Sequence, residues 1–176
     1  KETVIYFGRR VQLSNIPMLK AINDAPVARV NCFKLLGVHF SADLNCKHHV
    51  DFMLDKVAKR IYYIYLLTRA GVNSNHVVEV YCSIIRSVLE YASPVWHPGL
   101  TKTQSKSIDC IQKRCLRVIF PDLNYKEALF VSGLLRLSER REISARDLFN
   151  QIKRPDHGND YTTFVPIAPS PNIRHS

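Results

Sequence analysis

The stretch that decides the fold runs from Phe33 to Phe52 and reads FKLLGVHFSADLNCKHHVDF. Its first half carries β-branched and aromatic residues on both sides of Gly37, a pattern typical of two short strands with a bend between them. Its second half is polar and leads into a sequence with the period of a helix. The stretch therefore predicts a joint, near residue 44, between a small sheet and a helical region.

The residues before this joint contain further strand signals. TVIYF at residues 3–7 reads as a short strand, residues 11–19 as a weaker extended segment, and residues 27–40 as two strand-like runs. Together they predict a small antiparallel sheet. So few strands cannot bury both faces of a sheet, and we do not expect residues 1–44 to form a domain of their own.

Beyond the joint, the sequence has the pattern of successive helices. Apolar residues recur at steps of three and four from Val50 to Ile64, which predicts one long helix. The next segment is apolar around most of its circumference, so we expect it to be the most buried helix. The expected helices lie at about residues 45–70, 75–91, 103–120, 124–133 and 138–154.

The fold class that follows is α+β and mostly α. It comprises a small antiparallel sheet at residues 1–44, a bundle of about five helices at residues 45–154, and a Pro-rich extended tail at residues 155–176. Asn124 and Glu127 have the spacing of a capping box, which predicts where the fourth helix begins.

The charge of the chain favours polyanionic partners. Lys and Arg number 25 against 15 Asp and Glu, a formal net charge of +10, and each phosphate that a cation neutralises releases counterions. Ordinary solvated helix faces with core tyrosines remain an alternative explanation. The two candidate basic faces are Lys56, Lys59 and Arg60, interleaved with Tyr62, Tyr63 and Tyr65, and then Lys106, Lys113, Arg114 and Arg117.

The cysteines and the apolar segments indicate the compartment. Five cysteines lie inside apolar segments without a disulfide-like spacing, which favours reduced thiols in an intracellular protein, nuclear or cytoplasmic. No charged-then-apolar leader and no long apolar run is present, so we expect neither secretion nor a membrane span. The chain begins at Lys1, and we expect it to be a fragment.

A cluster of metal-ligand residue types, Cys46, His48, His49 and Asp51, occupies the start of the long helix. His49 and Asp51 match the H-x-D half of an iron facial triad, but that half-motif is common by chance and belongs on a strand. We interpret the cluster as the solvated polar start of a helix, without a metal. No catalytic arrangement of side chains can be assembled from the sequence.

Four blocks, in order, carry a resemblance: FKLLGVHFSADL, HVDFMLDKVAKRIYYIYLLTRAGV, IIRSVLEYASPVWHPGL and IQKRCLRVIF. Together they resemble the carboxy-terminal end of reverse transcriptases, RNA-directed DNA polymerases, of LINE-type (non-LTR) retrotransposons. The resemblance covers nearly the whole chain. It implies that the chain begins in a Lys-containing strand of the polymerase palm, at Lys1, downstream of the catalytic aspartates.

The same resemblance implies roles for particular residues. Phe33, Lys34, Leu35, Leu36 and Gly37 match the primer grip, a hairpin whose backbone approaches the primer, where a side chain on the glycine would block close approach. The helices that follow correspond to the thumb. The implied partners are an RNA–DNA hybrid or primer–template duplex and the upstream palm and fingers. Catalytic residues, and the magnesium of the intact polymerase, lie outside this chain, which alone we expect to be inactive.

Two alternatives remain open. Residues 33–72 also resemble a short amino-terminal domain of AlkB-type tRNA-modifying dioxygenases, although the iron and 2-oxoglutarate core of that family is missing from this sequence. The chain is otherwise interpretable as a retroelement remnant without a function.

Overall fold

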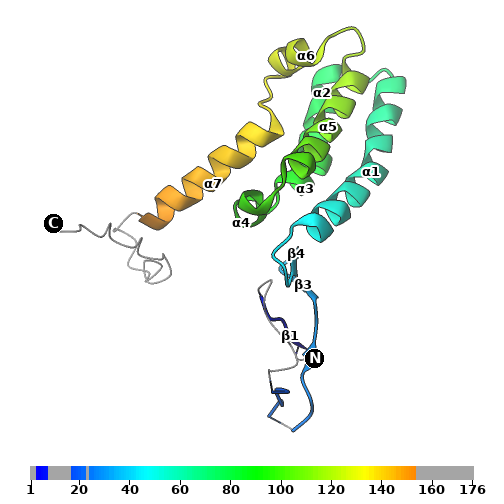
Figure 1. The fold of residues 1–176 in the computed structure, drawn as a ribbon. Helices are drawn as coiled ribbons and strands as arrows, with labels where there is room; N and C mark the ends of the chain where they lie inside the picture. Colours follow the sequence, from blue (N-terminus) through cyan, green and yellow to red (C-terminus); the bar gives the residue numbers. More distant parts are fainter. Residues whose placement is uncertain (1–2, 8–16, 23, 154–176) are drawn as a thin grey trace, which may run out of the picture.

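The computed structural model describes residues 3–7, 17–22 and 24–153 and confirms the predicted fold class. Short strands lie at one end of the molecule, and a bundle of helices continues from them (Figure 1). The predicted tail at residues 155–176 lies outside the described residues, as does most of the predicted extended segment at 11–19. Within the described residues, no helix is both long enough and apolar enough to cross a membrane.

The strands form two separate pairs. β3 (Cys32–Leu35) and β4 (Val38–Ser41) form the predicted antiparallel hairpin, with Phe33 opposite Phe40. β1 (Thr3–Val4) and β2 (Ala28–Arg29) pair in parallel instead of continuing an antiparallel sheet. The hairpin is therefore the part of the predicted sheet that the structure confirms.

Gly37 lies in the two-residue turn of this hairpin. Leu36 and Gly37 both have positive φ, 47° and 85°, the backbone that a tight hairpin turn with the twist of its strands requires. A Cβ built on Gly37 would lie 3.2 Å from Cε1 of Tyr91. A side chain at this position would therefore be in tight contact with a tyrosine of the same chain.

The first helix, α1 (Lys47–Arg69), confirms the predicted apolar face. Val50, Val57, Ile61 and Ile64 are all buried. This face packs against α5 (Lys102–Ile119) and against the helical run that follows α1. Because both α1 and α5 begin near the hairpin, their carboxy-terminal ends lie together at the other end of the bundle (Figure 1).

The predicted helix at 75–91 is one continuous run made of α2 (Ser74–Val80), the π-helix η2 (Tyr81–Arg86) and α3 (Ser87–Glu90). Tyr81, Ile85 and Leu89 are fully buried, which agrees with its expected place in the core. The π-helical register shifts the backbone hydrogen bonds of this segment. The guanidinium of Arg60 donates a hydrogen bond to the carbonyl oxygen of Ile84 within it.

Later helices follow short connections. The turns α4 (Ser93–Trp96) and η3 (His97–Gly99), not predicted from the sequence, lead to α5, which begins at a capping box of Thr101 and Gln104. α6 (Tyr125–Ser132) begins at the predicted capping box of Asn124 and Glu127. The last described helix is α7 (Leu137–Lys153), which packs against α4 and α5.

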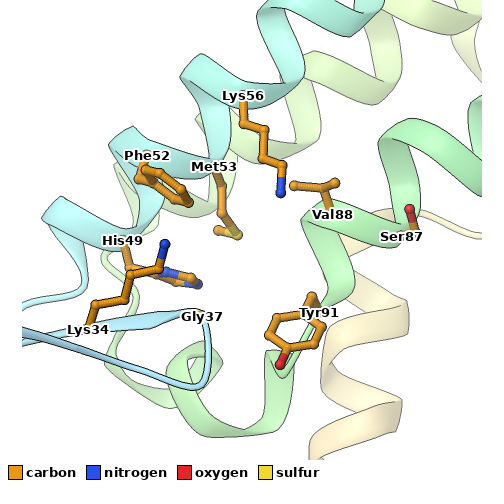
Figure 2. Close-up of a pocket in the computed structure, with 9 residues that line it drawn as sticks. All are labelled: Lys34, Gly37, His49, Phe52, Met53, Lys56, Ser87, Val88 and Tyr91. Atoms are coloured by element: carbon orange, nitrogen blue, oxygen red, sulfur yellow. The ribbon is translucent and has the colours of Figure 1, made fainter.

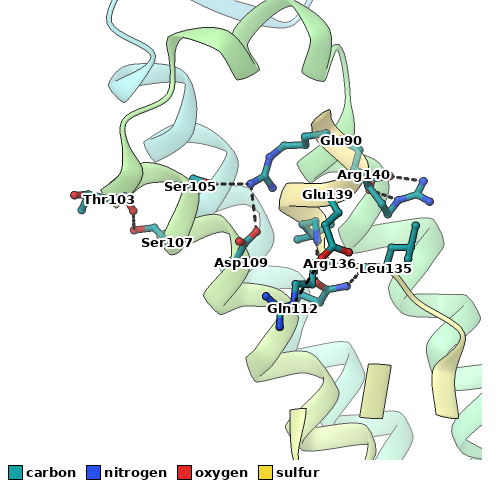
Figure 3. A network of polar contacts seen from close by, with 12 residues as sticks. Glu90, Thr103, Ser105, Ser107, Asp109, Gln112, Leu135, Arg136, Glu139 and Arg140 are labelled. Atoms are coloured by element: carbon teal, nitrogen blue, oxygen red, sulfur yellow. Dashed lines mark hydrogen bonds and ion pairs between the residues drawn. The ribbon is translucent and has the colours of Figure 1, made fainter. Parts of the chain in front are cut away.

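Buried polar groups hold the late helices together (Figure 3). Gln112 of α5 accepts hydrogen bonds from the Tyr125 hydroxyl and the Leu137 amide, at 3.0 and 3.1 Å, and donates to the Leu135 carbonyl oxygen at 3.0 Å. The fully buried Arg141 of α7 forms an ion pair of 3.2 Å with Asp109 of α5. These contacts fix α6 and α7 on α5.

Candidate nucleic-acid interface

The hairpin is fixed to the helices by two polar contacts. The Tyr91 hydroxyl, just after α3, donates a hydrogen bond of 2.8 Å to the Leu36 carbonyl oxygen. The His39 backbone N–H of β4 donates to Nδ1 of His49 on α1, over 3.5 Å. The turn and the second strand are therefore both held against the bundle.

A hollow lies between the hairpin, α1 and α3, and we refer to it as the hairpin cavity (Figure 2). Its volume is about 300 Å³. Lys34 of β3 and Lys56 of α1 bring cations to it from two elements, and no carboxylate of the described residues lines it. The lining residues are Lys34, Gly37, His49, Phe52, Met53, Lys56, Ser87, Val88 and Tyr91.

The predicted primer-grip residues separate into two groups. Lys34 and Gly37 line the hairpin cavity. Phe33, Leu35 and Leu36 are exposed on the hairpin, and 82% of Leu36 is accessible. Three exposed apolar side chains and one cation thus surround the turn.

The cluster at the start of α1 is divided between surface and interior. His48 and Asp51 are exposed, but His49 is only 2% exposed, so the prediction of a solvated histidine pair is wrong for His49. Its ring lies 5.5 Å from that of Trp96. The Cys46 thiol donates to the Trp96 carbonyl oxygen at 3.3 Å, and burial raises the pKa of this thiol. Cys46 and His49 of the cluster therefore pack against Trp96.

Burial is the main reason that the imidazole of His49 is neutral. Desolvation, and then repulsion by His39, lower the pKa of His49 to about 4. Burial first, and then Lys34 and His48, lower the pKa of His39 as well. Both imidazoles are therefore neutral at pH 7.

The cations predicted on α1 have different environments. Lys56 reaches the hairpin cavity and Lys59 is exposed to solvent. Arg60 is half-buried, and its guanidinium is used in the bond to Ile84. The tyrosines interleaved with these cations are not core residues, because Tyr62, Tyr63 and Tyr65 are 62%, 55% and 39% exposed.

The cations predicted on α5 do not form one patch. Lys106 is exposed, and the Lys113 ammonium lies over the Tyr125 ring at 5.2 Å. Arg114 and Arg117 lie at the carboxy-terminal end of α5, beside the end of α1.

Arg114 and Arg117 line a second hollow of about 550 Å³, which we call the arginine groove. Arg69, the last residue of α1, joins the two arginines of α5. Among the described residues, none of these guanidiniums forms an ion pair, and the lining contains no carboxylate. The lining residues are Tyr65, Thr68, Arg69, Arg114, Arg117, Val118 and Pro121. Arg69 was not predicted as part of a basic surface, because the arginines beside it come from another helix.

In the described part of the chain, no three His, Cys, Asp or Glu side chains converge in a way that could hold a metal ion. No family model, curated protein or solved structure matches the chain.

Proposed function

We propose that this chain is the primer-grip and thumb part of a LINE-type reverse transcriptase and that it holds primer–template nucleic acid. The proposal is supported by one observation above the others. Arg69, Arg114 and Arg117, from two helices, lie around one groove, and no carboxylate in the described part of the chain lines it.

Guanidiniums suit the phosphates of a nucleic-acid backbone, because their planar fork of donors can bind two phosphate oxygens at once. The exposed ring of Tyr65 offers a surface for a sugar or a base beside them. A net charge of +10 favours the same partner.

A structural role explains only part of this cluster. Arg69 and Arg117 lie in the last turns of α1 and α5, where a cation offsets the negative end of the helix dipole. Arg114 lies about one turn earlier and has a weaker interaction with that end. Three cations exceed what two helix ends of about half a charge each require, which leaves charge for phosphates.

The hairpin cavity and the arginine groove are separate surfaces. The groove lies at the end of α1 and against α5, whereas the cavity lies near the start of α1 and against α3. Lys56 and Arg69 are about 20 Å apart along the axis of α1, from a rise of about 1.5 Å per residue. We assign the backbone of the bound duplex to the groove.

The proposed role is binding, with the catalytic aspartates and magnesium supplied by an upstream palm. Purified chain with magnesium, dNTPs and a primed template should give no extension above a no-protein control. Robust synthesis would contradict the placing of catalysis outside this chain.

Binding is tested by fluorescence anisotropy with a labelled RNA–DNA hybrid at several salt concentrations. For each phosphate contact, the logarithm of the association constant should fall by about 0.9 per tenfold rise in salt. Affinity that does not change with salt would overturn the proposal.

A further inference from the structure

His49, which lines the hairpin cavity, carries a buried hydrogen-bond donor without a partner among the described residues. Nδ1 of His49 accepts the His39 N–H, and the ring is neutral at pH 7 because its pKa is lowered to about 4. The ring proton therefore lies on Nε2. Nε2 is buried and has no hydrogen-bond partner among the described residues.

The other polar groups of the cavity wall are of two kinds. The Tyr91 hydroxyl donates to Leu36, and the Ser87 hydroxyl donates to the Ser83 carbonyl oxygen, so both protons are used within the protein. The Lys34 and Lys56 ammoniums have no acceptor within the described residues. The side chains of the wall that still have a proton to donate are therefore His49, Lys34 and Lys56. A ligand that fits them is anionic and rich in hydrogen-bond acceptors.

The rest of the wall is apolar and partly aromatic. Phe52 and Met53 of α1 face Val88 of α3 across the cavity (Figure 2). The Lys34 ammonium lies 4.9 Å from the centre of the Phe52 ring, so a cation and an aromatic face lie next to each other. A planar ring that carries an anion would contact both.

The size of the cavity limits the ligand. A volume of about 300 Å³ is at the lower end for small-molecule sites, which run from about 300 to 1,000 Å³. It admits one ring system with one anionic group, and a base-paired duplex cannot enter.

We propose that the hairpin cavity binds a nucleoside monophosphate unit, with its phosphate at Lys34 and Lys56 and its base against Phe52 and the His49 ring. A free nucleotide and an unpaired nucleotide of a strand have this chemistry in common. The site is independent of the arginine groove, so it does not require that the chain hold a duplex.

Trp96 provides the readout, because it is the only tryptophan of the chain and its ring lies 5.5 Å from that of His49. The full chain is titrated with AMP, adenosine, inorganic phosphate and a short 5′-phosphorylated oligonucleotide, with excitation selective for tryptophan. We expect a saturable change with AMP that is at least about tenfold tighter than with adenosine or with phosphate alone. Competition of the oligonucleotide with AMP would assign the site to strand nucleotides, and its absence would assign the site to free nucleotides.

Lys34→Met and Lys56→Met should each weaken AMP binding at least fivefold, whereas Lys59→Met, an exposed cation outside the cavity, should not. His49→Phe should weaken it as well, and unfolding of that variant would leave the two lysine variants to decide. Absence of AMP binding, equal binding of phosphate alone, or equal effects of the three lysine variants would overturn the proposal. Arg114→Glu with Arg117→Glu should leave AMP binding unchanged, which separates this site from the proposed duplex contact.

Discussion

The Tyr91 hydroxyl donates a hydrogen bond of 2.8 Å to the carbonyl oxygen of Leu36, 55 residues earlier in the chain. Leu36 is the first residue of the hairpin turn and has a positive φ of 47°. Gly37 follows it, directly against the Tyr91 ring. The turn, the end of the central helical run and one wall of the hairpin cavity are thereby joined in a single contact.

Gly37→Ala should destabilise the chain by about 2 kcal/mol, because it adds a contact with Tyr91 to the strain of a left-handed backbone. Gly71→Ala is the matched control, since Gly71 also has a positive φ, 74°, but nothing within 4 Å of the added Cβ. Urea unfolding should show a smaller loss of about 1 kcal/mol for the control. Equal losses in the two variants would mean that the contact with Tyr91 adds no cost to a side chain at position 37.

Gln112→Leu should cost about 3 kcal/mol, because it leaves the Tyr125 hydroxyl, the Leu137 amide and the Leu135 carbonyl without their partner in the interior. Gln151→Leu, at an exposed position on α7, should change the free energy of unfolding by less than about 0.5 kcal/mol. Thermal and urea unfolding measure both variants. A loss at Gln112 no larger than at Gln151 would show that this network does not hold α6 and α7.

Asp109→Asn should cost about 3 kcal/mol or more, because it leaves the buried guanidinium of Arg141 without a carboxylate. Glu142→Gln breaks the exposed pair with Arg146 and should cost less than about 0.5 kcal/mol. The double replacement Asp109→Leu with Arg141→Met should recover most of the loss, since no buried charge then remains. Failure of the double variant to recover stability would point to packing as the main role of Arg141.

Stability should depend on pH through His49. Its folded-state pKa of about 4 lies below the ordinary value of 6.5, so the unfolded chain binds a proton more readily. The stabilisation by the neutral ring is complete above about pH 6.5 and is lost as the pH falls towards 4. Compared with wild type, His49→Phe should lose less stability between pH 7 and pH 4, by about 1–3 kcal/mol. Parallel pH profiles of the two proteins would contradict the burial of a neutral imidazole.

Local patterns predicted the helices because their causes are local. The apolar period from Val50 to Ile64 and the capping box at Asn124 depend on residues within one or two turns, and both are confirmed. The hairpin around Gly37 is likewise encoded by its own turn and strands. The π-helix at Tyr81–Arg86 was not predicted from the sequence.

The candidate sites depended on contacts that no local pattern contains. His49 appeared solvated because its polar neighbours are adjacent in sequence, whereas Trp96, which covers it, comes from a later turn. Arg69 gains its place beside Arg114 only when α1 and α5 pack with their ends together. The sequence showed Arg114 and Arg117 at the end of one helix, but it did not show that the end of α1 packs beside them.

The measurement that tests the central claim most directly compares two charge-reversal variants in binding to an RNA–DNA hybrid. Arg114→Glu with Arg117→Glu removes two cations of the arginine groove. Arg146→Glu with Lys153→Glu makes the same change in net charge on α7, outside the groove. We predict that the groove variant binds at least tenfold more weakly and has a salt slope smaller by about 2, with less than about a threefold effect of the control. Equal weakening in the two variants, or no binding by the wild-type chain at low salt, would contradict it.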